Sequence, residues 1–256
     1  MIDTAVHKGV PDGARRLIWD VFFAQAGRGI DFNAHLPWAD AADTRSVTIG
    51  DVATRAALVV RPALQPGVAM IGFVCVDARV RGRGYGAAML ERAHQMLEDD
   101  GIAAALLWTK IPPVYRGSGY QVLDRDRFVT FSSEPMARTV AHVDSAAWPG
   151  ADDIAGLPAF ATSAERLSDG NARAVVLHGG GGVTLADWHG GADAVARLMR
   201  AAGYDRWSVN LSSADRFDRM LDPALFAVET RDGAYTMVRR FDSSLAIDPV
   251  SLADRI

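Results

Sequence analysis

Hydrophobic residues in the first half of the chain follow two periods, one typical of β-strands and one typical of α-helices. Three apolar runs have the length of strands; they cover residues 45–49, 56–61 and 68–76. Between them lie Gly50-Asp51 and a segment that runs from Pro62 to Gly67. Because glycine, proline and aspartate favour turns at such places, the runs predict an antiparallel meander.

A helix is predicted after the third run. Five apolar residues recur there with the spacing of a half-buried helix: Met89, Leu90, Ala93, Met96 and Leu97. Gly101 follows, where a glycine commonly ends a helix. Asp12 is placed to cap an earlier helix of about fifteen residues. After a strand at 102–108, a strand at 124–130 is expected to close the first sheet, near residue 135.

The order of elements recurs in the second half of the chain. Residues 136–172 are rich in Ala, Ser, Asp and Pro, which indicates a linker with one helix around 151–167. The elements expected beyond it are strands at 173–178 and 183–188, a helix at 192–202, a strand at 207–211, a short helix at 214–221, and a hairpin of 225–230 with 234–240. The hairpin is expected to turn at Arg231-Asp232-Gly233.

This recurrence predicts two domains, 1–135 and 173–256, joined by the linker 136–172. The second domain is interpreted as a smaller, degenerate copy of the first. Its helix starts from Trp188-His-Gly-Gly-Ala, without the Arg-x-x-Gly-x-Gly turn that precedes the corresponding helix of the first domain. An unrelated α+β extension is the alternative.

Composition is that of an ordinary globular protein. The chain has 256 residues, of which 49% are hydrophobic, enough for one large core or two small ones. Its single cysteine excludes an internal disulfide and a cysteine-based metal cluster. The N-terminus lacks the apolar core of a signal peptide, and no apolar run reaches the roughly 18 residues of a membrane span. We therefore expect a cytoplasmic protein with neither a metal nor a membrane partner.

Charge and glycine are concentrated at one place. The chain is acidic overall, with 31 Asp+Glu against 27 Lys+Arg, so nucleic acid is not an expected partner. Yet Arg79, Arg81 and Arg83 lie in and beside a turn that contains Gly82, Gly84 and Gly86, between a strand and a helix. Glycine allows close backbone approach and a helix N-terminus attracts anions. The pattern predicts a phosphorylated small-molecule ligand.

Two glycine patterns overlap in this turn. Gly82, Gly84 and Ala87 satisfy the dinucleotide pattern G-x-G-x-x-G/A. That pattern requires an acidic residue at the end of the next strand, to hold a ribose hydroxyl. Here this strand ends in Trp-Thr-Lys at 108–110, which disfavours a nicotinamide cofactor.

The second pattern, Arg81-x-x-Gly84-x-Gly86 after a strand, resembles the acetyl-CoA-binding signature of the GNAT superfamily of N-acetyltransferases. In that family a short helix beyond the next strand carries a tyrosine, in a run like Tyr-x-x-x-Gly-Phe/Tyr. Residues 115–120 read Tyr-Arg-Gly-Ser-Gly-Tyr at a matching distance. The resemblance implies an α/β (α+β) fold with a mixed, mostly antiparallel sheet flanked by helices, and acetyl-CoA as co-substrate.

The resemblance also implies site residues. Tyr115 matches the tyrosine that protonates the departing thiolate, although a buried packing role is the alternative. The positions that match the family's cofactor contacts are Val74, Cys75, Val76, Arg81, Gly82, Arg83, Gly84, Tyr85, Gly86 and Ala87. We expect Cys75 to pack rather than to react, because a lone thiol on a buried strand usually does so.

Two positions depart from the family pattern. An asparagine often found about seven residues before the tyrosine is replaced by Trp108, and a glutamate that serves as base in some members is replaced by Ala103. The base for the attacking amine must therefore come from water, from His189 or from the C-terminal carboxylate, and the sequence leaves the three open.

The sequence says least about the acceptor substrate, the molecule that would receive the acetyl group. In the family, the region after the first helix helps to shape the acceptor pocket, and this points to His35, Trp38 and Asp40. The alternative is a loop held by buried aromatic residues. We expect a small-molecule primary amine as acceptor and a monomer or homodimer. Acetylation of a protein amine, or a non-catalytic acyl-CoA sensor, are the other interpretations.

Overall fold

The computed structural model describes residues 2–24, 36–50, 53–137, 139, 161–252 and 255. The chain folds into two compact units. The first consists of Met1–Leu123, Tyr235–Val250 and Asp254–Ile256, and the second of Asp124–Ala234 and Ser251–Ala253. In the described residues no helix has both the length and the apolar character needed to cross a membrane.

The first unit contains a mixed sheet whose strands follow the order β1-β2-β3-β4-β5-β11. Only the β4–β5 pair is parallel, and the other neighbours are antiparallel. In chain order the elements are β1 (Ala5–Lys8), α1 (Asp12–Phe22), the 3₁₀ helix η2 (Pro37–Asp40), β2 (Arg45–Ile49), β3 (Ala56–Pro62), β4 (Val68–Val76), the 3₁₀ helix η3 (Ala78–Val80), α3 (Tyr85–Asp99), β5 (Ala104–Thr109) and α4 (Pro113–Arg116). The predicted meander is present as β2, β3 and β4.

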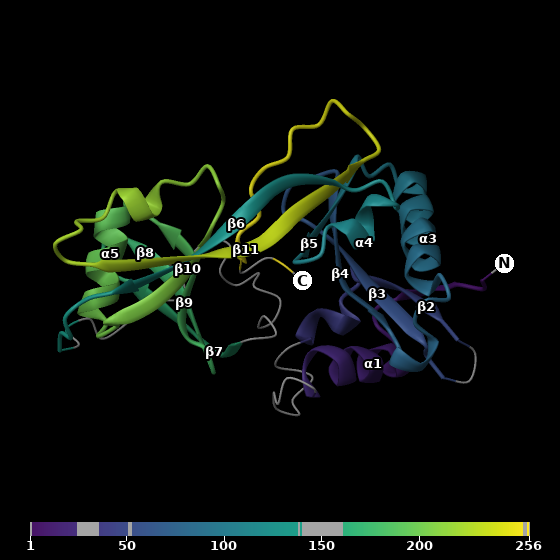
Figure 1. Ribbon diagram of the computed structural model, residues 1–256, viewed down its shortest axis with the longest axis horizontal. Coiled ribbons are helices and arrows are strands. Elements are labelled where there is room, and N and C mark those ends of the chain that lie inside the picture. Colours follow the sequence, from purple (N-terminus) through teal and green to yellow (C-terminus); the bar gives the residue numbers. More distant parts are fainter. Residues whose placement is uncertain are drawn as a thin grey trace. The chain divides into compact units, whose positions relative to one another are not determined.

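Helices α1 and α3 cover opposite faces of this sheet (Figure 1). All five apolar residues that predicted α3 are buried. They pack against sheet residues such as Leu58 and Ile71 in one continuous core. Because the apolar stripe of α3 meets the alternating inward residues of β2, β3 and β4, the helix fixes the position of the turn that precedes it.

The second unit has its own core, and its strands follow the order β6-β10-β9-β8-β7. Its strands alternate in direction except for the parallel β9–β10 pair. In chain order its elements are β6 (Gln121–Ser132), β7 (Ala161–Ser168), β8 (Arg173–Gly179), β9 (Gly182–His189), α5 (Ala192–Ala201), β10 (Arg206–Leu211), the 3₁₀ helix η6 (Phe217–Arg219) and β11 (Ala227–Arg240).

The two units exchange their closing strands. In the first unit the antiparallel neighbour of β5 is the end of β11, where Tyr235–Arg240 pair with Thr109–Ala104. In the second unit the antiparallel neighbour of β10 is β6, where Arg127–Ser132 pair with Leu211–Arg206. The expectation that 124–130 closes the first sheet is therefore wrong, because these residues pair with β10 and the first sheet is closed by a strand from the far end of the chain.

Three further predictions differ from the structure. The helix expected around 151–167 is a strand where the structure describes it, because β7 pairs with β8 from Ala161 onward. The short helix at 214–221 is reduced to η6. The hairpin turn at Arg231-Asp232-Gly233 does not form, since β11 runs straight through it. A Cβ on Gly233 would lie 2.7 Å from the Cβ of Asp126, so this glycine allows two strands to approach closely rather than to turn.

Domain boundaries follow from the same exchange. The first stretch of the first unit ends at Leu123, and Tyr235–Val250 belong to the same unit. The prediction from the sequence was a division at the linker 136–172. Each unit nevertheless repeats one order, three strands followed by a helix and a strand parallel to the third, as β2-β3-β4-α3-β5 and β7-β8-β9-α5-β10.

Candidate active site

Strand β4 separates from β5 where the acyl group is expected. The two strands pair in parallel only from Val68↔Ala104 to Met70↔Leu106, and no later pair is recorded in the described residues. On its other side, β4 has a bulge, because Phe73 and Val74 lie opposite the single residue Leu58. Phe73 has φ +50°, which is rare for a residue other than glycine. From Phe73 to Val76, β4 thus has no recorded strand pairing on its β5 side in the described residues.

The glycine turn follows this segment. Gly82 has φ +77° and Gly84 has φ +80°, backbone conformations that glycine adopts without strain. A Cβ on Gly82 or on Gly86 would meet no atom within 4 Å, so the surface of the turn is open. Gly84 is the N-cap of α3, and the first N–H groups of a helix have no partner within it. The turn therefore offers an open set of amide donors and a positive helix end.

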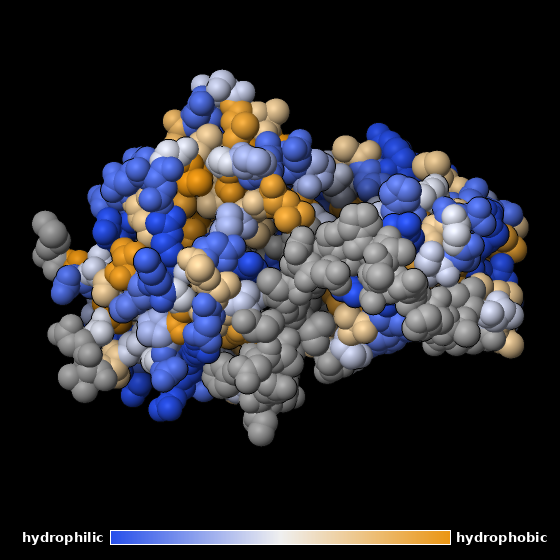
Figure 2. All heavy atoms as spheres, turned by 180° about the vertical axis from the view of Figure 1, so that it is seen from behind, coloured by the Kyte–Doolittle hydropathy of each residue, from blue (hydrophilic) through white to orange (hydrophobic). Residues whose placement is uncertain are grey.

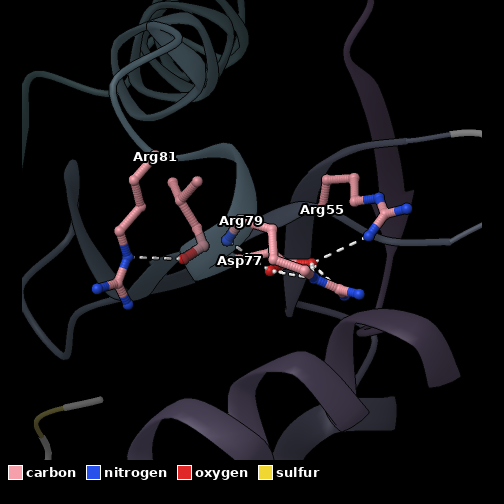
Figure 3. A network of polar contacts seen from close by, with 5 residues as sticks. Arg55, Asp77, Arg79 and Arg81 are labelled. Carbon is pink, nitrogen blue, oxygen red and sulfur yellow. Dashed lines mark hydrogen bonds and ion pairs between the residues drawn. The ribbon is translucent and has the colours of Figure 1, made fainter.

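Asp77 holds the start of the turn. Its carboxylate accepts hydrogen bonds from the backbone N–H of Arg79 at 3.0 Å and from Nη1 of Arg55 at 3.0 Å (Figure 3). The Arg79 guanidinium binds the same carboxylate through Nε and Nη2, at 3.0 and 2.6 Å. Hydrogen bonds from Arg79, followed by the bond from Arg55, hold the pKa of Asp77 well below its usual range. Asp77 therefore stays ionised and anchors both arginines.

The three arginines of the turn are not equivalent. Arg79 is bound to Asp77, whereas Arg81 lies apart from that carboxylate and donates from Nε to the carbonyl oxygen of Val76 at 3.2 Å (Figure 3). Arg83 is exposed. Among the cations that the sequence groups together, Arg79 is thus the one that binds the loop's own carboxylate.

Tyr115 lies on α4, which begins at Pro113 and ends one turn later. Its side chain is half-buried, and burial raises the pKa of its phenol. The ring packs edge-on against Tyr120, with ring centroids 6.1 Å apart. Because the phenol stays protonated at neutral pH, Tyr115 can donate a proton to a leaving group.

Comparison with known proteins agrees with this geometry. Residues 62–123 match the family model of the acetyltransferase (GNAT) domain, a segment that contains the bulge, the turn and Tyr115. This segment of the chain therefore resembles the GNAT acetyltransferase domain. The sequence matches none of the curated proteins with which it was compared.

Solved GNAT structures share the fold over almost the whole chain. The GCN5-related N-acetyltransferase from Kribbella flavida has a TM-score of 0.65 at 16% identity, covering 94% of this chain and 72% of that one. A second GCN5-related N-acetyltransferase, from Anabaena variabilis, has a TM-score of 0.64 at 13% identity, covering 93% of this chain and 73% of that one. Eis1 from Mycobacterium abscessus has a TM-score of 0.58 at 15% identity, covering 94% of this chain and 74% of that one. Because these matches extend over both units, the shared fold is not confined to the segment with the glycine turn.

The two departures from the GNAT pattern are visible in the structure. Ala103, in place of the glutamate, lies just before β5, and its carbonyl oxygen accepts a hydrogen bond from the N–H of Phe241. Trp108, in place of the asparagine, packs against the buried cluster of Val68, Ala104, Leu106 and Val238, with the Arg255 guanidinium 4.8 Å from its ring centroid. Neither position provides a carboxylate, an imidazole or an amide to the GNAT site.

The acceptor candidates have different surroundings. His35 lies outside the described residues. Asp40 is exposed and forms an ion pair with Arg15. Trp38 is buried, with its ring centroid 5.8 Å from that of Phe73 and the guanidinium of Arg61 on it. These contacts of Trp38 agree with a loop held by buried aromatic residues, and a substrate role for the three residues stays a prediction.

The structure adds residues that the sequence did not single out. Phe22, the last residue of α1, and Phe23, which follows it, pack with Trp38 around Phe73. Their ring centroids lie 5.4 and 6.2 Å from that of Phe73. Phe22 and Phe73 are half-exposed, so they form an apolar surface beside the free part of β4. The single available signal was an aromatic residue within an otherwise aliphatic strand.

Cys75 and His189 complete the set of candidates. Cys75 is buried, and burial raises the pKa of its thiol to about 12, so the thiolate does not form at neutral pH. This agrees with a packing role. His189 is exposed at the end of β9 and belongs to the second unit. The C-terminal carboxylate lies outside the described residues.

Proposed function

We propose that the protein is an acetyl-CoA-dependent N-acetyltransferase that acetylates a primary amine on a small molecule. The observation that carries the proposal is the coincidence, within one unit, of a strand free on one side, an open glycine turn at a helix N-terminus and a protonated tyrosine. These three features correspond to the three parts of the co-substrate: the pantetheine arm, the pyrophosphate and the thiol.

The chain's own groups suit binding of acetyl-CoA. Main-chain N–H groups from Gly82 to Ala87 would donate to the pyrophosphate, with Arg81 and Arg83 adding positive charge. Backbone groups of Val74, Cys75 and Val76 would bind the pantetheine arm and the acyl oxygen. The bulge supports this assignment, because strained backbone concentrates at functional sites.

The transfer step requires a donor for the oxyanion and an acid for the thiolate. The amine nitrogen would form a bond to the acyl carbon, and a backbone N–H of β4 would stabilise the tetrahedral oxyanion. As the carbon–sulfur bond breaks, the phenol of Tyr115 would donate its proton to the sulfur. The Tyr115 pKa is raised by burial, so the phenol carries this proton at neutral pH.

The proton of the attacking amine needs a separate acceptor. Ala103 and Trp108 provide none, which leaves water as a candidate. For the acceptor itself, Phe22 and Phe73 offer a half-exposed apolar surface next to the expected acyl position. That surface favours a small organic amine over a lysine of a folded protein.

The first test is a calorimetric titration with acetyl-CoA. Wild type should bind, and Gly84→Asp should not, because its side chain places a negative charge at the expected pyrophosphate position. Gly101→Asp is a matched control: Gly101 also has a positive φ, +71°, and open space around its Cβ, but it lies at the other end of α3. Equal binding by all three proteins would refute the assignment of the turn.

The absence of a family-type base favours one second candidate, an acyl-CoA-binding sensor without turnover. It predicts binding of acetyl-CoA together with slow, amine-independent release of the thiol across a panel of primary amines. Amine-dependent release of free CoA would exclude it.

A further inference from the structure

One polar side chain interrupts the apolar face of α3. His94 is 2% exposed, between Ala93 and the buried pair Met96 and Leu97. Its Nε2 lies 3.1 Å from the hydroxyl of Tyr120, while Nδ1 has no hydrogen-bond partner in the described part of the chain. Burial, followed by the charge of Arg239, lowers the pKa of His94 to about 4, so the imidazole is neutral at physiological pH. A buried group with one orphan nitrogen costs stability that an apolar residue would not.

Tyr120 connects this histidine to Tyr115. It is fully buried, its ring packs edge-on against Tyr115, and its backbone N–H donates to the carbonyl oxygen of Tyr115 at 3.3 Å. The backbone between the two tyrosines forms a tight turn, with hydrogen bonds from Ser118 to Tyr115 and from Gly119 to Arg116. A displacement of Tyr120 is therefore passed on directly to Tyr115.

A second contact ties the same segment to α3. Arg239 of β11 donates from Nη1 to the carbonyl oxygen of Ser118 at 2.9 Å, and its Nη2 lies 3.6 Å from Oε1 of Glu98, one turn beyond His94 on α3. The segment 115–120 is thus held at both Ser118 and Tyr120. Glu98 and Arg239 are partly exposed, so the buried His94–Tyr120 pair is the more rigid of the two ties.

We propose that His94 is a positioning residue for Tyr115, acting through Tyr120. One rigid helix, α3, would then hold both the pyrophosphate at its N-terminus and the proton donor through His94. The distance from the co-substrate to the phenol would be fixed by that helix and not by the short α4. This inference rests on the proposed function, since it takes Tyr115 as the acid that protonates the thiolate.

The test is a double-mutant cycle on turnover. Acetyl-CoA is the donor, the most active amine of a primary-amine panel is the acceptor, and free CoA is measured. His94→Phe keeps a ring of similar size and removes the hydrogen bond. We expect kcat to fall about 10- to 100-fold while the Kd for acetyl-CoA stays within about twofold, because misplacement of a catalytic group by about 1 Å costs that much. His94→Gln, which can still bond to Tyr120, should recover most of the loss.

The decisive comparison is made in the Tyr115→Phe background. There, His94→Phe should lower kcat by less than about twofold, because the group that it positions is gone. Val47→Ala is the control for stability alone: Val47 is a buried core residue on β2, and its loss should lower the melting temperature without changing kcat.

An equal loss of kcat from His94→Phe in both backgrounds would overturn the inference, as would a lower melting temperature with unchanged kcat. These outcomes differ from failure of the proposed function, in which wild type itself neither binds acetyl-CoA nor releases CoA. In that case Tyr115 has no thiolate to protonate, and the positioning role is refuted with it.

Discussion

The backbone N–H of Arg79 and the guanidinium of the same residue both bind the carboxylate of Asp77, which caps η3. One aspartate therefore sets the backbone at the start of the glycine turn and also binds the guanidinium of Arg79. Asp77→Asn should loosen this start and raise the Kd for acetyl-CoA about 3- to 10-fold, in line with the loss of charged hydrogen bonds. Asp100→Asn, which breaks an exposed ion pair with Arg45 at the far end of α3, should leave the Kd unchanged. Calorimetry measures both.

The same carboxylate predicts a pH dependence. The pKa of Asp77 is lowered in the folded state, so its contribution to stability is fully present above its ordinary value, 3.8, and is lost as the pH falls toward the folded pKa. In urea titrations between pH 6 and about 2.5, wild type should lose more free energy of unfolding than Asp77→Asn. Parallel losses in the two proteins would contradict this role.

Tyr115→Phe tests the acid directly. General acid catalysis contributes about 10²- to 10⁴-fold, so kcat should fall by that order with little change in the Kd for acetyl-CoA. Because burial raises the Tyr115 pKa above its ordinary value of 10.0, the wild-type kcat should show no loss from phenol ionisation until the pH exceeds about 10. A fall that begins near pH 8 would assign the acid to another group.

Phe73 offers a test of backbone strain. Glycine normally destabilises a strand relative to alanine, but at φ +50° alanine keeps the strain and glycine relieves it. Both variants lose the aromatic contacts with Phe22, Phe23 and Trp38, so we compare them with each other. Phe73→Gly should be more stable than Phe73→Ala by about 1 kcal/mol in urea unfolding. The reverse order would mean that the backbone relaxes when the ring is removed.

Gly233 should tolerate no side chain. A Cβ there would lie 2.7 Å from the Cβ of Asp126 and 2.9 Å from its carbonyl oxygen. Gly233→Ala should therefore cost about 1–3 kcal/mol, the usual range for overpacking. Gly181→Ala is the matched control, because a Cβ on Gly181 would meet nothing within 4 Å. Thermal unfolding of the two variants distinguishes close approach from a general effect of losing glycine.

The parts of the fold that depend on local pattern could be predicted. The stripe of Met89, Leu90 and Leu97 identified α3, because a helix that covers a sheet needs that period. The strand runs gave β2, β3 and β4 within about a residue of their bounds. The glycine turn could be predicted because its chemistry lies in consecutive residues.

Features that depend on distant partners could not be predicted. Gly233 looks like a turn residue until Asp126 is placed beside it. The partner of 124–130 is β10, and nothing in those seven residues distinguishes β10 from β5 as a neighbour. The roles of Phe73 and His94 depend on side chains from α1 and Tyr120 that the sequence separates by about 25 to 50 positions.

The face drawn in Figure 2 carries hydrophobic residues as separate patches among hydrophilic ones. Among the exposed large apolar residues, Leu64 and Met220 are far apart in the sequence and belong to different units. Single apolar residues of this kind are normal on a protein surface and identify no partner.

The exchange of β6 and β11 has a consequence for the evolution of the gene. If the gene were divided near codon 135, the first product would lack the strand beside β5, and the second would lack the strand beside β10. Each product would carry an open sheet edge, which favours aggregation. The exchange therefore acts against gene fission and against loss of either half. A second half without the Arg-x-x-Gly-x-Gly turn would be retained because it provides the strand beside β5.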